Sequence, residues 1–418
     1  MKAEASGTVI NGKVNAPSSK SALQRYIAGA LLADGISQIN SVTLCDDAEA
    51  AIDIAGTLGA DINVSGNSIR IKGGFRPLSS QIFCGESGLS ARMFTPIAAL
   101  HNNEITINGR GSVLKRPFDM TERPLSALGA VVVSENGYLP LKVRGPLRGG
   151  EVFADGSVSS QFITGLLMAL PVVRPDSVLV VENLVSKPYI ELTLKIQQEF
   201  GIEIINENFR RFSITGGQSY RPGNFTVEGD WSGAAFLMVM GAIAGEVMVT
   251  GLDINSMQAD RAIIKALLLA GADVNISDEG VKVSRGRLNC FEFDISDCPD
   301  LAPPLTVLAA ACRGKTVIRG AGRLAAKESD RGMALEKTMR AIGARVVNHG
   351  HSLEIEGGEP LKGGTAGSFN DHRIAMALAA SALLCVSPVM IEGFECINKS
   401  YPGFADDYRS LGGTIKLI

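Results

Sequence analysis

The pattern of apolar residues along the chain repeats six times. In each copy an apolar stretch with helical periodicity ends at a glycine, and a short segment of alternating apolar and polar residues follows. Apolar periodicity that ends at a glycine predicts a helix with a left-handed C-terminal cap. The spacings between these glycines are 70, 72, 70, 72 and 69 residues, so one unit of about 70 residues tiles the chain. The six glycines are Gly59, Gly129, Gly201, Gly271, Gly343 and Gly412.

The alternating segment after each glycine predicts a β-hairpin. In five copies it ends at a further glycine, which gives hairpins over 60–74, 130–145, 202–217, 272–286 and 344–358. Upstream in the first copy, the pattern predicts a helix over 19–35, a strand over 37–42 and a helix over 46–58. The predicted unit is therefore β-α-β-α-β-β, which makes the chain an α/β protein.

Six such units predict two lobes of three units each. The sixth copy ends at Ile418 with only one strand after its helix, and we expect a first strand over 5–10 to complete it. One lobe is then discontinuous and comprises residues 1–17 and 223–418, while residues 18–222 form the inserted lobe. The crossings fall near Pro17 and in the segment 220–224, and a cleft between two lobes is a natural place for a ligand.

Composition narrows the class of protein. With 418 residues, 45% of them hydrophobic, the chain has enough apolar material for two or three domain cores. Its 40 Lys and Arg residues are balanced by 43 Asp and Glu residues, giving a net charge of −3. This balance excludes a broad basic surface for nucleic acid or anionic membrane, so we expect neither partner. Any anion must be bound by a local cluster of cations.

Cysteine usage and apolar runs indicate the compartment. The seven cysteines contain no Cys-x-x-Cys pair, and four scattered histidines do not suggest a zinc site. The N-terminal segment lacks the pattern of a signal peptide. The longest apolar run, 374–391, contains two serines and Pro388, so we interpret it as a buried helix and strand rather than a membrane span. We expect a cytoplasmic protein.

Six segments place cations, hydroxyl groups or glycines at predicted helix starts and loops. At such positions a side chain and the helix dipole act together on an anion. Each segment also has an ordinary structural explanation, such as a capped helix, a glycine turn or a solvated charged loop. The segments are 16–25, 85–92, 115–124, 156–162, 323–331, and 370–373 with 398–402.

Two carboxylates in these regions are candidates for proton transfer. Lys327 and Arg331 are four residues apart and are predicted to share a helix face, with Glu328 beside them. A carboxylate among cations can move a proton while its neighbours hold a phosphate. Asp300 precedes an apolar helix, where it is either a helix cap or a positioned base, and the residues alone favour the cap.

Two apparent nucleotide motifs are discounted. The segment 320–325 fits Gly-x-Gly-x-x-Ala, but no acidic residue ends a strand about 20 positions later. The Gly314-Lys315-Thr316 sequence has Ala309 where a phosphate-binding loop of the Walker type needs glycine.

Taken together, the motifs resemble the enolpyruvyl transferases, and among them the enzymes that act on shikimate 3-phosphate. That family has two lobes, each of three β-α-β-α-β-β units, which agrees with the six-fold repeat. The matching segments run in order from Pro17 to Pro402: SSKSALQR, GESGLSAR, TERPL, SVSSQF, SKPYIELT, VEGDWSGA, CPDLA, KESDR, NDHRIAM and NKSYPGF.

The resemblance implies transfer of the enolpyruvyl group of phosphoenolpyruvate to the 5-hydroxyl of shikimate 3-phosphate, with release of inorganic phosphate. It implies no metal and no other cofactor. The residues it assigns to shikimate 3-phosphate are Lys20, Ser21, Arg25, Ser159, Ser160, Gln161, Ser186, Tyr189, Asp300 and Lys327. Those it assigns to phosphoenolpyruvate are Lys20, Gly88, Arg123, Gln161, Arg331, Arg373 and Lys399.

The implied reaction explains these residue types. Two substrates with two phosphates and two carboxylates need several fixed cations to offset their mutual repulsion. Addition and elimination also need acid and base groups. Our hypothesis makes Asp300 the base at the 5-hydroxyl, places Glu328 near the methylene carbon, and uses Lys20 as proton donor or charge stabiliser.

The match to the family has two departures. Arg323 stands where the family commonly has an asparagine that contacts shikimate 3-phosphate, so it is left out of the site. Leu89 replaces the hydroxyl residue often found after the loop glycine, and this change bears on how the loop responds to inhibitors that mimic phosphoenolpyruvate.

Three other functions are weighed against this one. Enolpyruvyl transfer to a UDP-amino sugar would require a reactive cysteine in 109–123, which contains none. A small-molecule kinase would use GESGLSAR as its phosphate loop but would leave the other cation clusters unexplained. A non-catalytic anion-binding module would leave Asp300 and Glu328 without a role. We expect a monomer with small-molecule substrates only.

Overall fold

The computed structural model describes residues 1–418 and contains six four-stranded sheets built to one plan. Within each sheet the strand order is first, second, fourth and third of the β-α-β-α-β-β unit. The first two strands are parallel and the last pair forms an antiparallel hairpin or its equivalent, as in the sheet of β6, β7, β9 and β8. This is the repeated α/β architecture predicted from the sequence.

Three stretches of chain contain the whole unit without interruption. The first consists of β6 (Gln81–Phe83), α3 (Gly88–Ala98), β7 (Ile105–Asn108), α4 (Glu122–Ala127), β8 (Val131–Glu135) and β9 (Tyr138–Arg144). The second consists of β10 (Glu151–Asp155), α5 (Ser160–Ala169), β11 (Ser177–Glu182), α6 (Lys187–Glu199), β12 (Ile204–Glu207) and β13 (Arg211–Ile214). The third consists of β18 (Glu292–Asp294), α9 (Ala302–Ala311), β19 (Gly314–Arg319), α10 (Arg331–Ala341), β20 (Arg345–Asn348) and β21 (Ser352–Gly357).

The other three units each take one strand from a distant part of the chain. One unit has α1 (Lys20–Leu32), β3 (Ile36–Asn40), α2 (Asp46–Thr57), β4 (Asp61–Ser65) and β5 (Ser68–Lys72), completed by β14 (Asn224–Thr226). The next has α7 (Trp231–Ala244), β15 (Gly245–Thr250), α8 (Ile263–Ala270), β16 (Asp273–Ser277) and β17 (Gly280–Ser284), completed by β2 (Ile10–Asn15). The last has β22 (Gly364–Gly367), α11 (His372–Ser381), β23 (Val389–Glu392), α12 (Phe404–Ser410) and β24 (Thr414–Leu417), completed by β1 (Lys2–Ser6).

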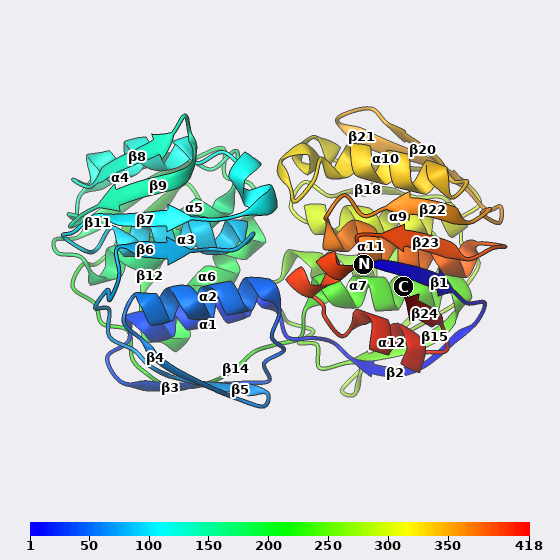
Figure 1. Ribbon diagram of the computed structural model, residues 1–418, viewed down its shortest axis with the longest axis horizontal. Helices are drawn as coiled ribbons and strands as arrows, with labels where there is room; N and C mark the ends of the chain where they lie inside the picture. Colours follow the sequence, from blue (N-terminus) through cyan, green and yellow to red (C-terminus); the bar gives the residue numbers. More distant parts are fainter. The chain divides into compact units, whose positions relative to one another are not determined.

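The N-terminal strand occupies an interior position in the sixth sheet. β1 lies between β23 and β24 and pairs antiparallel with both, so the two chain ends meet there (Figure 1). The strand covers residues 2–6 rather than the 5–10 expected from the sequence. The difference arises because residues 7–9 lie outside both strands, with a bend at Thr8, and Ile10 already begins β2.

The chain divides into two compact units. Unit 1 comprises Met1–Pro17 and Glu228–Ile418, and unit 2 comprises Ser18–Val227. The return to unit 1 therefore comes at residue 228 and not at residue 223, where the sequence analysis placed it. The reason is β14, which pairs parallel with β3 through Asn224 to Thr226 and so belongs to the sheet of the first unit of unit 2.

The core of each unit is built around three helices that are buried on almost all sides. In unit 1 all residues of α7 and of α11 are buried, and in unit 2 all residues of α3 are buried. A helix that is apolar all round gives a weak amphipathic pattern, which is why the repeat is more visible at the helix ends than within the helices. The run 374–391 splits into α11 and β23, and no helix is long and apolar enough to cross a membrane.

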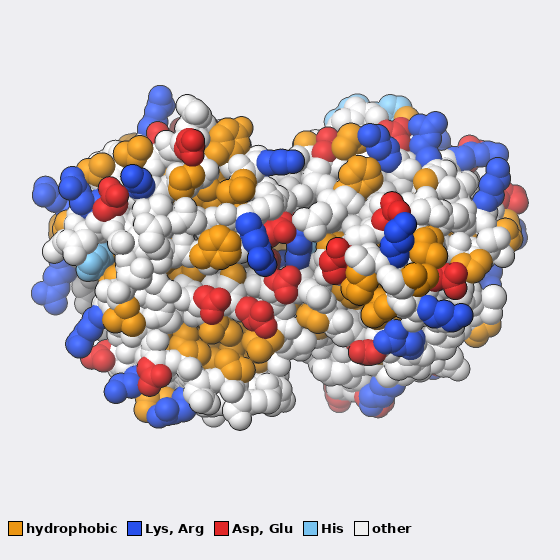
Figure 2. Space-filling view, viewed as in Figure 1, with side chains coloured by type: hydrophobic (Ala, Val, Ile, Leu, Met, Phe, Trp, Pro, Cys, Tyr) orange, Lys and Arg blue, Asp and Glu red, His pale blue; other side chains and the backbone are white.

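The surface carries both signs of charge. Figure 2 shows Lys and Arg side chains interspersed with Asp and Glu side chains on the visible face of each unit. This distribution agrees with the near-neutral composition and provides no continuous basic surface there.

The glycines that mark the repeat all adopt positive φ, as the sequence predicts. Their φ values are +113°, +84°, +78°, +87°, +99° and +104° in chain order from Gly59 to Gly412. Gly271 is closely confined, because a Cβ atom there would lie 2.5 Å from the carbonyl oxygen of Arg287; Gly59 meets the carbonyl oxygen of Arg76 at the same distance. A side chain at this position would therefore meet both backbone strain and a fixed neighbour.

We predict that Gly271→Ala lowers the free energy of unfolding of unit 1 by about 3 kcal/mol, since strain and collision add. The matched control is Gly350→Ala, in the turn between β20 and β21, where φ is +80° and no atom lies within 4 Å of the added Cβ. That control should lose only about 1 kcal/mol. Urea unfolding followed by circular dichroism measures both, and equal losses would contradict the close approach at Gly271.

Candidate active site

The first turns of the three buried helices of unit 2 lie together. Gln24 of α1 donates to the Ser87 Oγ before α3 at 3.3 Å, and Arg92 of α3 donates to Gln161 Oε1 of α5 at 2.9 Å. Arg25 of α1 donates to Thr164 Oγ1 of α5 at 3.3 Å. These cross-links bring three predicted segments, 16–25, 85–92 and 156–162, to one end of the helix group.

Each of these helices in unit 2 begins with a serine cap. Ser19, Ser87 and Ser159 accept hydrogen bonds from backbone N–H groups of α1, α3 and α5, respectively. A serine cap satisfies a backbone donor without adding charge. The positive ends of the three helix dipoles are therefore not neutralised by their own caps.

Lys20 and Arg25 are held in different ways. The Lys20 Nζ pairs with the Asp47 Oδ2 at 2.8 Å, so an anionic ligand has to compete with a carboxylate for this cation. Arg25 is 1% exposed, and four of its five N–H donors go to Thr193, Ser21, Thr164 and the Tyr189 carbonyl. Burial lowers the pKa of Arg25 to about 10. One Nη1 hydrogen remains for a ligand.

The remaining predicted residues of unit 2 lie at the starts of α5 and α6. Ser160 and Gln161 form the first turn of α5, after the Ser159 cap. Ser186 precedes α6 and is buried with a left-handed φ of +55°, a conformation that costs energy for a residue other than glycine. The first turn of α6 contains Tyr189, whose carbonyl holds Arg25.

The cation that lies against Gly88 is Arg116 and not Arg123. A Cβ atom added to Gly88 would lie 2.4 Å from the Arg116 Nη1, so the buried guanidinium rests on this glycine. The next residue, Pro117, accepts from Arg92 at 2.9 Å, and Arg92 also holds Gln161. Arg116 therefore belongs to the Gly88 and Gln161 group.

Arg123 occupies a different place. It is exposed and lines a separate pocket with acidic side chains from 119–122, from β10 and from the end of β11, namely Asp119, Glu122, Glu151, Asp155 and Glu182. These carboxylates disfavour the binding of a doubly negative substrate in this pocket. The sequence analysis assigned Arg123 and not Arg116 to phosphoenolpyruvate. Both arginines precede a proline in the same loop, and of the two it is Arg116 that lies against Gly88.

In unit 1 the central feature is Asp300, which contacts three cations. Its Oδ1 lies 2.7 Å from the Arg331 Nη1 and 3.3 Å from the Lys327 Nζ, and its Oδ2 lies 3.2 Å from the Arg373 Nη2. Burial alone would raise the pKa of Asp300, but Arg373, Lys327 and Arg331 outweigh it and hold that pKa well below the ordinary value. The N-cap position of α9 is Leu301 and no side-chain cap hydrogen bond is present there, so Asp300 does not cap this helix.

Arg331 is fully buried and binds three carboxylates. Besides Asp300, its Nη2 donates to Glu328 Oε2 at 2.6 Å and its Nε donates to Asp371 Oδ2 at 3.0 Å. Burial opposes the charged form, but these carboxylates raise the pKa of Arg331 above its ordinary value. The guanidinium thus fixes the relative positions of Glu328, Asp300 and the start of α11.

Lys327 and Arg331 do not share a helix face, contrary to the sequence prediction. Lys327 ends the 3-10 turn Ala321–Ala326 in extended conformation, and α10 begins only at Arg331, after the Asp330 cap. The two cations meet through Asp300 instead. Burial lowers the pKa of Lys327. Arg323 lies in the same 3-10 turn and donates to the Ser296 carbonyl.

Arg373 and Lys399 complete the group of cations in unit 1. Lys399 is 5% exposed and donates to the Asn370 carbonyl at 2.7 Å. Phe369 and Asn370 both have left-handed φ values, +54° and +55°, so strained backbone presents that carbonyl. The Arg373 Nη1 is buried and has no hydrogen-bond acceptor. A buried guanidinium donor without an acceptor is costly unless a ligand oxygen fills its position.

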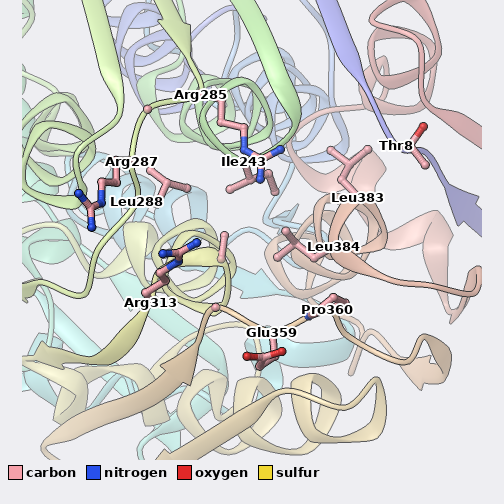
Figure 3. Close-up of a pocket in the computed structure, with 13 residues that line it drawn as sticks. Thr8, Ile243, Arg285, Arg287, Leu288, Arg313, Glu359, Pro360, Leu383 and Leu384 are labelled. Carbon is pink, nitrogen blue, oxygen red and sulfur yellow. The ribbon is translucent and has the colours of Figure 1, made fainter.

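A pocket of about 570 Å³ in unit 1 lies at the other end of the same helices and contains none of the predicted site residues. Residues at the C-terminal ends of α7, α9 and the turn after α11 line it, including Ile243 and Leu384. Figure 3 shows the Arg285, Arg287 and Arg313 guanidinium groups around one side of this pocket. Arginines there offset the negative ends of three helix dipoles, which explains them without a ligand.

Comparison with known proteins agrees with the geometry. Residues 5–408 match the family described as EPSP synthase (3-phosphoshikimate 1-carboxyvinyltransferase). A 3-phosphoshikimate 1-carboxyvinyltransferase of Clostridium kluyveri is 39% identical over 411 residues, which cover 98% of this chain and 96% of the relative. The enzyme of the same name from Clostridium perfringens is 39% identical over 412 residues, with 97% of each chain covered.

A solved structure, EPSP synthase from Acinetobacter baumannii, superimposes with a TM-score of 0.85, 25% sequence identity and 99% coverage of both chains. The repeated fold and the cation groups at the helix starts define an enolpyruvyl transferase. Within that class, the chain belongs to the EPSP synthase family. It transfers the enolpyruvyl group of phosphoenolpyruvate to the 5-hydroxyl of shikimate 3-phosphate, a step in the shikimate pathway to aromatic compounds.

Proposed function

We propose that both units supply residues to this reaction and that their cations divide the two substrates. In unit 2, the groups assigned to shikimate 3-phosphate lie at the starts of α1, α5 and α6. In unit 1, Arg331, Arg373 and Lys399 bind phosphoenolpyruvate, while Asp300 and Lys327 also reach shikimate 3-phosphate. The observation that supports this assignment most strongly is the buried Arg373 Nη1, which has a donor hydrogen and no acceptor in the protein.

The role of Asp300 as base follows from its electrostatic surroundings. With its pKa held low by three cations, it is ionised but a weak base in the free protein. Substrate oxygens that bind Arg373, Lys327 and Arg331 draw these cations away from it. Its pKa then rises, and the carboxylate becomes a stronger base at the moment when the 5-hydroxyl is in place.

The reaction needs one proton on the methylene carbon and then its removal. During addition, the 5-hydroxyl oxygen bonds to C2 of phosphoenolpyruvate, its proton passes to Asp300, and the methylene carbon becomes a methyl group by protonation. We assign the exchange of that proton to Glu328, which Arg331 holds at 2.6 Å, with Lys20 as donor or charge stabiliser. During elimination, the C2 to phosphate oxygen bond breaks and the methyl group returns a proton to the carboxylate.

Among the cations of unit 2, we assign Arg116 to phosphoenolpyruvate in place of Arg123, together with Lys20, Gly88 and Gln161. Its support is the position of the guanidinium on Gly88, where any side chain would push against it. An arginine gives an anion both charge and a fixed pair of donors.

We also propose that the enzyme works as a cytoplasmic monomer that requires its two small-molecule substrates and no metal or other cofactor. All seven cysteines are free thiols, and five of them are buried, as suits a reducing compartment.

We predict that Arg116→Gln raises the KM for phosphoenolpyruvate by about 10- to 100-fold, because one charge-assisted contact is lost. The KM for shikimate 3-phosphate should stay within about twofold. Arg123→Gln is the matched control and should resemble the unchanged enzyme. Steady-state kinetics measures both variants, and a larger effect of Arg123→Gln would restore the original assignment.

We predict that Glu328→Gln lowers kcat by about 100-fold or more, since the amide cannot exchange the methylene proton. Calorimetry should show shikimate 3-phosphate binding within about threefold of the unchanged protein. Glu336→Gln, which breaks only an exposed pair with Arg340 on α10, is the control and should keep full activity. Lost binding with preserved turnover would reject the role of Glu328.

A further inference from the structure

The loop between β15 and α8 in unit 1 carries none of the predicted site residues, and hydrogen bonds join it to the start of α7. Trp231 donates from its backbone to Gln258 Oε1 at 3.1 Å and from its indole to the Asp253 carbonyl at 3.1 Å. Gln258 donates in turn to the Gly229 carbonyl at 2.8 Å. The loop ends in the 3-10 turn Ala259–Ala262, where Asp260 accepts a hydrogen bond from Ser232 Oγ.

Asp260 is a carboxyl group with no contact to solvent. Its exposed fraction is 0%, its Oδ2 accepts from Ser232, and its Oδ1 has no hydrogen-bond partner. The charged groups that act on it electrostatically are Asp300 before α9, Arg373 on α11 and the Asp230 cap of α7. The buried Cys298 thiol is a further neighbour. Burial first, then Asp300, raises the pKa of Asp260 to about 7, against the opposing effect of Arg373.

Arg373 has a buried hydrogen-bond donor without a partner. Its Nη2 contacts Asp300 at 3.2 Å, but its Nη1 is buried without an acceptor, and it forms no direct ion pair with Asp260. Burial alone lowers the pKa of Arg373; Asp300 and, to a smaller extent, Asp260 and Asp230 raise it despite Arg331. Thus a buried carboxyl that can lose its charge near neutral pH acts electrostatically on a guanidinium that has one free donor.

We propose that Asp260 is a positioning residue that sets the affinity of Arg373 for phosphoenolpyruvate through its own state of protonation. The inference rests on the proposed assignment of Arg373 to that substrate. When Asp260 is neutral, the Arg373 charge is offset mainly by Asp300 and attracts the substrate anion strongly. When Asp260 ionises, a second carboxylate offsets the same charge, and the attraction weakens.

The direction of the pH effect follows from the raised pKa. Asp260 is protonated below about 7 and ionised above it, so the affinity for phosphoenolpyruvate falls as the pH rises through this range. By linkage, bound phosphoenolpyruvate must shift the pKa of Asp260 further upward. The groups of shikimate 3-phosphate that we assign to unit 2 should not respond to the charge of Asp260.

The test compares Asp260→Asn with the unchanged enzyme between about pH 6 and 8.5 by steady-state kinetics. Phosphoenolpyruvate titrates in the same range, but its own ionisation cancels in the ratio of the two KM values. That ratio, unchanged enzyme over variant, should be near one at low pH and rise about three- to tenfold at high pH. The KM for shikimate 3-phosphate and kcat should stay within about twofold. A ratio that is constant with pH, or equal changes for both substrates, would overturn the proposal.

Ser232→Ala provides a second variant that keeps the carboxyl group. The Ser232 hydrogen bond lowers the pKa of Asp260, so its loss should raise that pKa and move the change in KM to higher pH. This result is accessible even if Asp260→Asn folds poorly, and an unmoved profile would contradict the proposal.

Arg373→Gln distinguishes a failure of the proposed function from a failure of the role of Asp260. If it leaves the KM for phosphoenolpyruvate unchanged, the assignment of Arg373 fails; if it raises that KM while the Asp260 variants show no pH effect, only the role of Asp260 fails.

Discussion

The buried ion cluster around Arg331 is the constraint on which the chemistry of unit 1 depends. One fully buried guanidinium binds Asp300, Glu328 and Asp371, which come from three different segments of the chain. Removing one partner of such a cluster leaves an uncompensated buried charge, so the arrangement is rigid for electrostatic reasons. The proposed base and the proposed proton carrier are therefore positioned by the same cation. In the free protein, carboxylates occupy the cations that the substrates are proposed to use.

The repeat explains how two units of one fold differ in chemistry. The buried helices of unit 2 begin with neutral serine caps. In unit 1, Asp230 and Asp371 cap α7 and α11, and Asp300 lies in the 3-10 turn Pro299–Leu301 that precedes α9. Neutral caps leave the helix dipoles available to anions, as suits the proposed binding of shikimate 3-phosphate, which carries a phosphate and a carboxylate. Asp300 and Asp371 instead form ion pairs with cations of unit 1, and Asp300 is the proposed base. A change of residue type at the helix starts thus underlies the proposed division between anion binding and proton transfer.

The sequence was sufficient for features that depend on local rules. The glycine caps, the five hairpins and the helix starts at Lys20, Gly88 and Ser160 follow from periodicity and capping, and the family motifs identified the reaction. It failed where tertiary contacts decide. The three-residue strand β14 is too short to show a pattern, and its pairing moved the boundary between units. The contact between Arg116 and Gly88, on which our assignment of Arg116 rests, is likewise not visible in the sequence, because Arg116 and Arg123 have the same local context. Asp260 belongs to no motif that was singled out, and its burial became visible only in the fold.

The claim that substrate anions take over the cations of Asp300 is tested most directly by proton uptake on binding. Phosphoenolpyruvate is titrated calorimetrically into the Glu328→Gln variant saturated with shikimate 3-phosphate, near pH 5.5 and in buffers of different ionisation enthalpy. The reference is the same titration on the double variant that also carries Asp300→Asn. Protonation of the substrate itself contributes equally to both titrations and drops out of their difference. The account predicts that the first protein takes up more protons than the second, by at least about 0.2 per site. Equal uptake by the two proteins would contradict it, because Asp300 would then keep its cations when the substrates are bound.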